Sequence, residues 1–191
     1  MTQNEYYVPV VLSPSEIGVA THLAVSRQSV NRAAGVTERM VGYRDSIDIN
    51  IDGVLGEFAV CKYLNVYPDL TFERRSGGHD CVYKGLSCDV KTRPYKENQC
   101  LQVPQYKAET SSEIYILAEV ERTKIHILGF ATSAELFQPQ NLTPSVREGK
   151  SHYELTWAQL TPIGDLCEYA IQKSQVVGYG TRSGVCDVRE F

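Results

Sequence analysis

The chain has 191 residues, 42% of them hydrophobic and 22% charged, and its net charge is −4 at pH 7. This composition is typical of one globular domain and excludes a disordered, collagen-like or coiled-coil protein. No apolar run reaches the roughly 18 residues of a membrane-spanning helix, and no basic leader precedes an apolar segment, so we expect a cytoplasmic protein without a membrane partner. The six cysteines include no Cys-x-x-Cys pair and are expected to be reduced thiols.

Two helices are predicted before the first strand. The segment Ser13-Pro14-Ser15-Glu16 is a capping box with proline at the first helical position, and it predicts a helix over 14–34. Gly35 supplies the stop signal. Apolar residues then recur at helical spacing over 46–64, which predicts the second helix.

Strands are predicted next along the chain. Short runs rich in isoleucine, leucine, valine and tyrosine predict strands over 113–120 and 124–131. A hairpin is predicted over 80–92, with Lys84-Gly85 as its two-residue turn, and a short helix over 132–137. This order of elements predicts an α/β fold in which helices flank a mixed central sheet of about four to five strands.

The predicted hairpin carries an unusual set of charges. With Lys84-Gly85 as the turn, Asp80 lies opposite Asp89, and side-chain alternation places both on one face with Lys91. Two opposed carboxylates about 5 Å apart repel each other and require a cation or a shared proton between them. A hard divalent cation such as Mg²⁺, which prefers oxygen ligands, would remove the repulsion.

Glu57 is the second unusual residue. It lies on the apolar stripe of its predicted helix, where an unpaired carboxylate is costly. Gly53 and Gly56 would let this helix approach a strand closely. We therefore expect Glu57 to complete a three-carboxylate cluster with the two hairpin aspartates.

At this point the sequence resembles a known family. The segments GVLGE at 53–57, GHD at 78–80 and DVK at 89–91 are similar to motifs of the PD-(D/E)XK, or restriction-endonuclease-like, nuclease superfamily, and in particular of its small phage and prokaryotic members. The resemblance covers about 53–131. His79 departs from it, since the motif name has proline at that position.

The resemblance implies a role for each motif residue. Asp80 and Asp89 would bind Mg²⁺, or Mn²⁺ in its place, with the backbone carbonyl of Val90 as a further ligand. Lys91 would position or deprotonate the attacking water, and Glu57 would orient that water or complete a second metal site. The implied activity is metal-dependent hydrolysis of DNA phosphodiester bonds, by an endonuclease or an exonuclease.

The resemblance also implies how the chain is organised. We expect a single nuclease domain over 1–191 with a restriction-endonuclease-like core at about 46–137. The N-terminal helix 14–34 and the C-terminal region 138–191 are then family-specific additions. A homodimer is a further expectation, and for a phage protein the cytoplasm in question is that of the host.

Local charge favours a nucleic-acid partner although the whole chain is acidic. Between Thr71 and Lys107, seven basic residues stand against four acidic ones. Such a basic stretch is typical of a phosphate-binding surface. The residues that we expect to contact DNA are Arg74, Arg75, Arg93 and Lys96.

Two alternatives use the same residues differently. In the first, the fold is a nucleic-acid-binding or regulatory module with weak or no catalysis. In the second, the hairpin acids are structural and lie on a solvated surface, where most acidic side chains are found.

Overall fold

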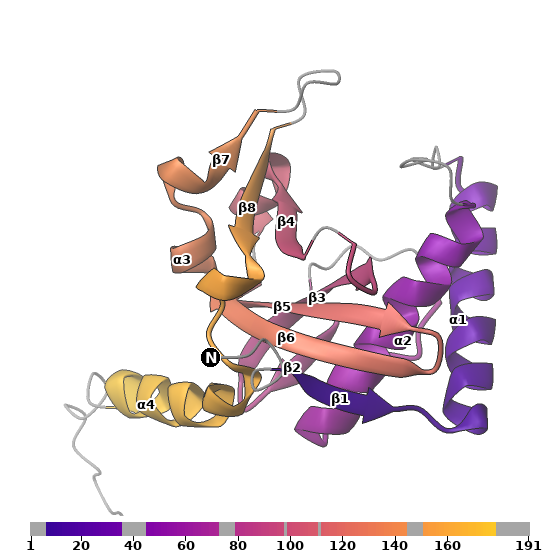
Figure 1. Ribbon diagram of the computed structural model, residues 1–191, viewed down its shortest axis with the longest axis horizontal. Helices are drawn as coiled ribbons and strands as arrows, with labels where there is room; N and C mark the ends of the chain where they lie inside the picture. The colour runs from indigo at the N-terminus through magenta and orange to yellow at the C-terminus, as the bar shows by residue number, and fades with distance from the viewer. Residues whose placement is uncertain are drawn as a thin grey trace, which may run out of the picture.

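The computed structural model describes residues 7–35, 45–72, 79–97, 99–110, 112–144 and 151–178. Its centre is a five-stranded mixed sheet with the strand order β1-β6-β5-β3-β2 (Figure 1). The strands of this sheet are β1 (Val8–Val11), β2 (Cys81–Tyr83), β3 (Leu86–Pro94), β5 (Ile114–Glu121) and β6 (Lys124–Thr132). The predicted α/β fold with a mixed central sheet is therefore confirmed.

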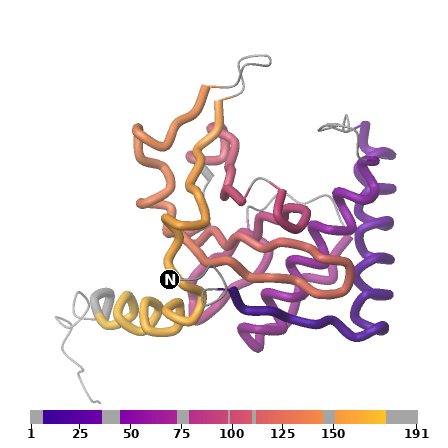
Figure 2. The backbone as a smooth tube through the Cα atoms, viewed as in Figure 1, coloured from indigo at the N-terminus to yellow at the C-terminus, as the bar shows by residue number. Residues whose placement is uncertain are grey.

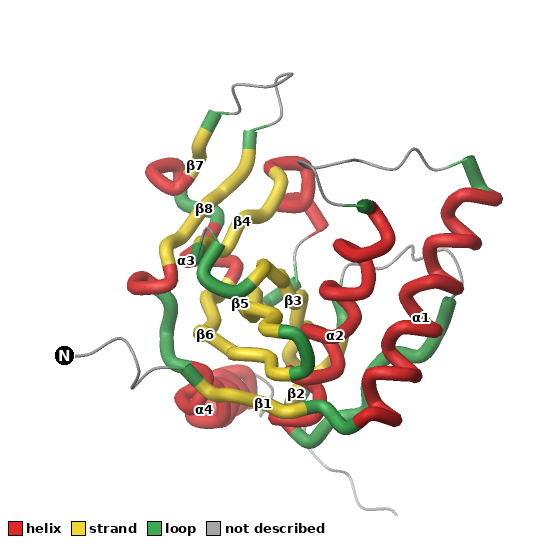
Figure 3. The backbone as a smooth tube through the Cα atoms, turned by 45° about the vertical axis from the view of Figure 1, so that its right-hand side comes forward, coloured by secondary structure: helices red, strands yellow, loops and turns green. Residues whose placement is uncertain are grey.

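One long helix covers a face of the central sheet, and a second long helix packs on the first. Helix α2 (Ser46–Leu64) packs against β3 and β5, and α1 (Pro14–Ala33) packs against α2, as Figures 1 and 3 show. The predicted capping box is present, because the Glu16 N–H donates to Ser13 Oγ at 3.2 Å and the Glu16 carboxylate accepts from the Ser13 N–H at 2.6 Å. The predicted bounds of both helices are correct to within one residue.

The opposite face carries a second, smaller sheet. Its strands are β4 (Cys100–Pro104), β7 (Leu142–Thr143) and β8 (His152–Thr156), in the order β4-β8-β7. Figure 1 shows this sheet rising from one end of the central sheet, at the upper left. The sequence did not predict this sheet as a unit, since its strands are short and two of them lie in the region 138–191.

Shorter helices complete the fold. The described residues include α3 (Ser133–Leu136), α4 (Leu166–Gly178) and four 3₁₀ helices, η2 (Gln105–Thr110), η3 (Pro139–Asn141), η4 (Trp157–Gln159) and η5 (Ile163–Asp165). Helix α4 and helix α1 lie at opposite ends of the central sheet (Figures 1 and 2). Within the described ranges we find no helix with both the length and the apolar character needed to cross a membrane.

The central sheet separates two apolar cores. Ile114 and Ile116 of β5 belong to the core under α2, whereas Tyr115 and Leu117 belong to the core under the small sheet. The connection between the parallel strands β3 and β5 contains β4 and η2, so it crosses the face opposite to α2. Side-chain alternation along each strand therefore decides which layer a residue meets.

The β2–β3 hairpin forms as predicted. Cys81 pairs with Cys88 and Tyr83 with Leu86, with Lys84-Gly85 as the turn. Both turn residues have positive φ, 48° and 85°. These angles are those of a type I′ turn, whose twist matches that of the two strands.

Helix α2 touches β3 at a glycine. A Cβ atom added to Gly56 would lie 2.3 Å from Thr92 Oγ1 and 3.3 Å from Thr92 Cγ2. A Cβ atom added to Gly53, one turn earlier, would meet no atom within 4 Å. Close approach of α2 to β3 therefore requires glycine at position 56 but not at position 53, and Gly56 sets the distance between the helix and the strand.

We expect Gly56→Ala to destabilise the fold by about 1–3 kcal/mol, because the added methyl group overpacks the contact with Thr92. Gly53→Ala is the matched control and should stabilise the fold by roughly 0.5–1 kcal/mol through helix propensity. Urea unfolding measures both effects. Adding Thr92→Ala to Gly56→Ala should recover most of the loss, and a loss that persists in the double variant would contradict the proposed contact.

Candidate functional site

The two faces of β3 have opposite characters. Cys88 and Val90 belong to the core under α2, and Thr92 meets Gly56 on the same side. Asp89 and Lys91 must then point to the other side, toward β4 and η2. Helix α2, which carries Glu57, thus packs on the apolar side of the strand, opposite to Asp89 and Lys91.

Asp80 is held at the edge of β3. Its N–H donates to the Cys88 carbonyl at 2.7 Å, and its Oδ2 accepts from the Val90 N–H at 2.8 Å. The carboxylate thus takes the place of the next ladder hydrogen bond after β2. Since the N–H and C=O of one strand residue point to the same edge, the Val90 carbonyl is directed to the edge where Asp80 lies.

Asp89 is a buried carboxylate with two cationic partners. Its side chain is 4% exposed. Lys91 Nζ forms an ion pair with Oδ1, and Lys107 Nζ lies 3.2 Å from Oδ2. Burial and the neighbouring Asp89 charge raise the pKa of Tyr115, the β5 residue paired with Asp89, to about 12. Burial of a charge is tolerated only with such partners.

Lys107 is the site residue that sequence reasoning missed. It follows Asp89 by 18 positions and belongs to η2, a spacing that fits no motif. Burial opposes its positive charge, but Asp89 and then Asp80 outweigh burial, so the pKa of Lys107 is raised. Lys107 is therefore influenced by both aspartates. The sequence signal was only its membership of the basic stretch.

Glu57 is bound elsewhere. Its Oε2 accepts from Arg27 Nη1 at 2.8 Å, and the same guanidinium donates to the carbonyls of Asp69 and Thr71 at 2.8 and 3.0 Å. A pocket of about 190 Å³ between α1 and α2 is lined by both side chains. Arg27 thus joins α1 to α2 and to the segment that follows α2.

The expected three-carboxylate cluster is not assembled. Among the described residues, no three Asp, Glu, His or Cys side chains lie close enough together to hold a metal ion. The site that the structure does bring together consists of Asp80, Asp89, Lys91, Lys107 and the Val90 backbone.

The other predicted DNA-binding residues are spread over the molecule. Arg93 is half-buried and donates to Gln102 Oε1 at 2.6 Å, and Gln102 in turn donates to the Glu154 carboxylate of β8. Lys96 is exposed beyond the end of β3, with its ammonium 5.0 Å from the ring centre of Tyr95. Arg74 and Arg75 lie outside the described residues.

Glu119 is a buried acid beside this network. It pairs in register with Arg93 of β3, and its side chain is fully buried. Neither carboxylate oxygen meets a donor in good geometry within the described ranges, although the Lys96 N–H and the Gln99 amide lie near enough to favour the charged form. Burial outweighs these donors and raises the pKa of Glu119.

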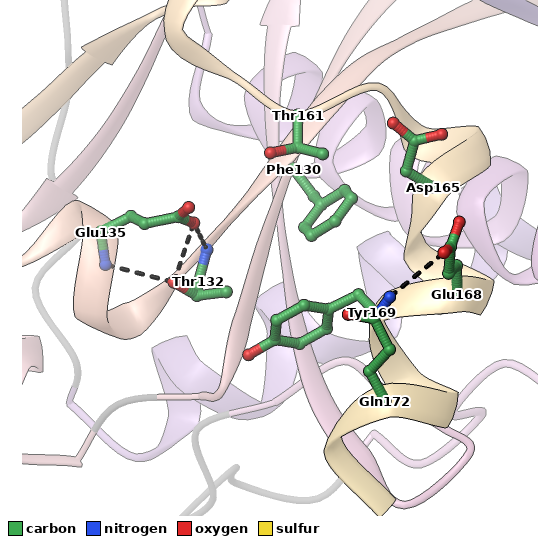
Figure 4. A pocket seen from close by; sticks show the side chains of 8 residues that line it. All are labelled: Phe130, Thr132, Glu135, Thr161, Asp165, Glu168, Tyr169 and Gln172. Carbon is green, nitrogen blue, oxygen red and sulfur yellow. Dashed lines mark hydrogen bonds between the residues drawn. The ribbon is translucent and has the colours of Figure 1, made fainter.

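A pocket of about 210 Å³ between β6 and α4 carries further acids. Figure 4 shows that the Glu135 side chain turns back to Thr132, and its carboxylate accepts hydrogen bonds from the Thr132 N–H and hydroxyl, both at 2.8 Å. The Glu168 carboxylate accepts a hydrogen bond from the Gln172 side chain at 3.1 Å. These two carboxylates serve local helix contacts. The pocket adds no partner to the Asp80–Asp89 site.

No known protein family, curated protein or solved structure matches this chain. Its function is therefore inferred from the chemistry of the Asp80–Asp89 site.

Arg27→Ala should cost about 2–4 kcal/mol of unfolding free energy, because it leaves the Glu57 carboxylate without this partner in a largely buried place. The exposed pair of Lys62 and Glu16 has the same 2.8 Å distance. Lys62→Ala is therefore a matched control and should cost less than about 1 kcal/mol. Chemical denaturation compares the two, and equal losses would show that burial of the Arg27 pair has no energetic weight.

Glu119→Gln should raise the unfolding free energy at pH 7 by on the order of 1 kcal/mol. The pKa of the Glu119 carboxyl group in the folded protein lies above its ordinary value of 4.5. The unfolded chain therefore loses the carboxyl proton at a lower pH than the folded protein does. Wild-type stability falls as pH rises from the unfolded pKa to the folded one. At pH 4, below this ordinary value, the gain should be much smaller, because the carboxyl group is then mostly protonated in the unfolded chain as well. Urea titrations at the two pH values test this, with the exposed Glu97→Gln as the control. A gain that is the same at both pH values would count against the raised pKa.

Proposed function

We propose that this chain is a metal-dependent nuclease that hydrolyses phosphodiester bonds of DNA at Asp80, Asp89 and Lys91. The observation that carries the proposal is the buried pair of aspartates on one hairpin, with a lysine on the same strand in contact with the second aspartate. The resemblance of the 53–57, 78–80 and 89–91 segments to nuclease motifs supports it.

The donor set suits a hard divalent cation. Mg²⁺ in proteins is commonly held by one or two carboxylates, and water and substrate phosphates complete its shell. Asp80, Asp89 and the Val90 carbonyl supply such a protein share, all of it oxygen and all of it on or beside the β2–β3 hairpin. A bound Mg²⁺ or Mn²⁺ would lower the pKa of its water and polarise the scissile phosphate.

The side chains have separate tasks in this proposal. Asp80 is aligned by its bond to the Val90 N–H, and Asp89 by its two lysines. Lys91 places a positive charge where negative charge develops on the phosphate, and its position on a central strand preorganises that charge. The water-orienting role of Glu57 stays a prediction, since Arg27 holds its carboxylate here. A homodimer and a cytoplasmic location belong to the same proposal.

One observation favours a second candidate, a nucleic-acid-binding module without catalysis. Asp89 is already neutralised by Lys91 and Lys107, as it would be in a purely structural ion network. In that case the basic side chains around the hairpin would bind phosphates without hydrolysing them.

Asp89→Asn should lower the DNA cleavage rate by at least about 100-fold, because the substitution removes a metal-binding charge but keeps the side-chain shape. Lys91→Ala should have a similar effect. The assay uses labelled single-stranded, duplex and branched DNA with Mg²⁺, Mn²⁺ or EDTA. Asp165→Asn, an exposed aspartate on η5, is the matched control and should cleave like wild type.

The outcomes separate the candidates. Cleavage that needs the cation and is lost in both variants supports the nuclease. DNA binding without cleavage by a folded wild type favours the binding module. Absence of cleavage on every substrate, together with no Mg²⁺ binding by calorimetry, would overturn the metal-dependent reaction.

A further inference from the structure

The Asp80–Asp89 site is electrically balanced as it stands. Asp80 and Asp89 bring two negative charges, and Lys91 and Lys107 bring two positive ones. Lys107 Nζ lies 3.2 Å from Asp89 Oδ2, and the Asp80 charge also acts on this ammonium. A divalent cation added to this group would leave two uncompensated positive charges in a largely buried place, which is costly. One of the lysines must therefore move when the cation binds.

The surroundings of the two lysines decide which of them moves. Lys91 belongs to β3, which lies between β5 and β2, and its side chain is 22% exposed. Lys107 belongs to a 3₁₀ helix of six residues, and its side chain is 34% exposed. Short 3₁₀ helices have weaker hydrogen bonds than strands or α-helices. Lys107 is thus the lysine that can leave at the lower cost.

We propose that Lys107 occupies the divalent-cation position of the Asp80–Asp89 site and is displaced when the cation binds. The inference rests on the proposed function, because it concerns the metal of that reaction. It assigns Lys107 a regulatory role: the lysine keeps the aspartates paired without metal and lowers the affinity of the site for a lone cation. A substrate phosphate, which brings negative charge of its own, offsets this penalty, so cation and DNA bind cooperatively.

Lys107→Met tests the competition, because methionine has a similar length and no charge. With its competitor removed, Mg²⁺ should bind on the order of tenfold more tightly, as expected for the loss of one close charge interaction. The measurement is calorimetric titration of the full chain with Mg²⁺ at fixed ionic strength, without DNA. Lys124→Met, an exposed lysine at the start of β6, is the control and should bind Mg²⁺ like wild type.

Lys107→Gln guards against a folding defect, since glutamine keeps a hydrogen-bond donor toward Asp89 but loses the charge. Its Mg²⁺ affinity should rise as that of Lys107→Met does. Unchanged or weaker Mg²⁺ binding in folded Lys107→Met and Lys107→Gln, with clear binding by wild type, would overturn the displacement proposal and leave the nuclease intact. Failure of wild type and both variants to bind Mg²⁺ would overturn both proposals.

Discussion

Side-chain alternation along β3 decides on which side of the central sheet Asp89 and Lys91 lie. The strand must present apolar atoms to α2, and Cys88 and Val90 meet that demand with Thr92 against Gly56. Asp89 and Lys91 alternate with these residues and therefore lie on the opposite face, where Asp89 contacts Lys107 of η2. The position of the candidate site and the packing of β3 against α2 are thus two consequences of one periodicity.

Burial makes an unpaired charge in this site costly in free energy. Asp89 is almost inaccessible, so its negative charge needs compensation whether or not a metal is bound. Two lysines supply the compensating positive charge: Lys91, two positions after Asp89 in the sequence, and Lys107, 18 positions after it. Arg27 does the same for Glu57 across 30 positions. Asp89 and Glu57, two of the three carboxylates in the predicted cluster, therefore have cationic partners, and these partners lie on different elements.

Local signals predicted the local structure well. The Ser13–Glu16 capping box predicted the start of α1, and the two-residue turn at Lys84-Gly85 predicted the hairpin register. The cluster of Glu57 with the hairpin acids was wrong for a definite reason: an apolar stripe shows that a helix face is buried, but not against what. The contact of Lys107 with Asp89 could not be predicted from the sequence, because it joins segments that are distant along the chain. The small β4-β8-β7 sheet could not be predicted either, since its short strands carry little periodicity and pair across distant segments.

Asp80 also affects the edge of the central sheet, where strands of other molecules could pair. Strand β2 is only three residues long and is the last strand of the described sheet, so it covers just the first part of β3. The Val90 N–H beyond it would be a free pairing group at a sheet edge, the kind of group that recruits a strand from another molecule. The Asp80 carboxylate occupies that N–H and puts a negative charge beside it. An aspartate of the candidate site thus also occupies an edge N–H group that could otherwise pair with a strand of another copy.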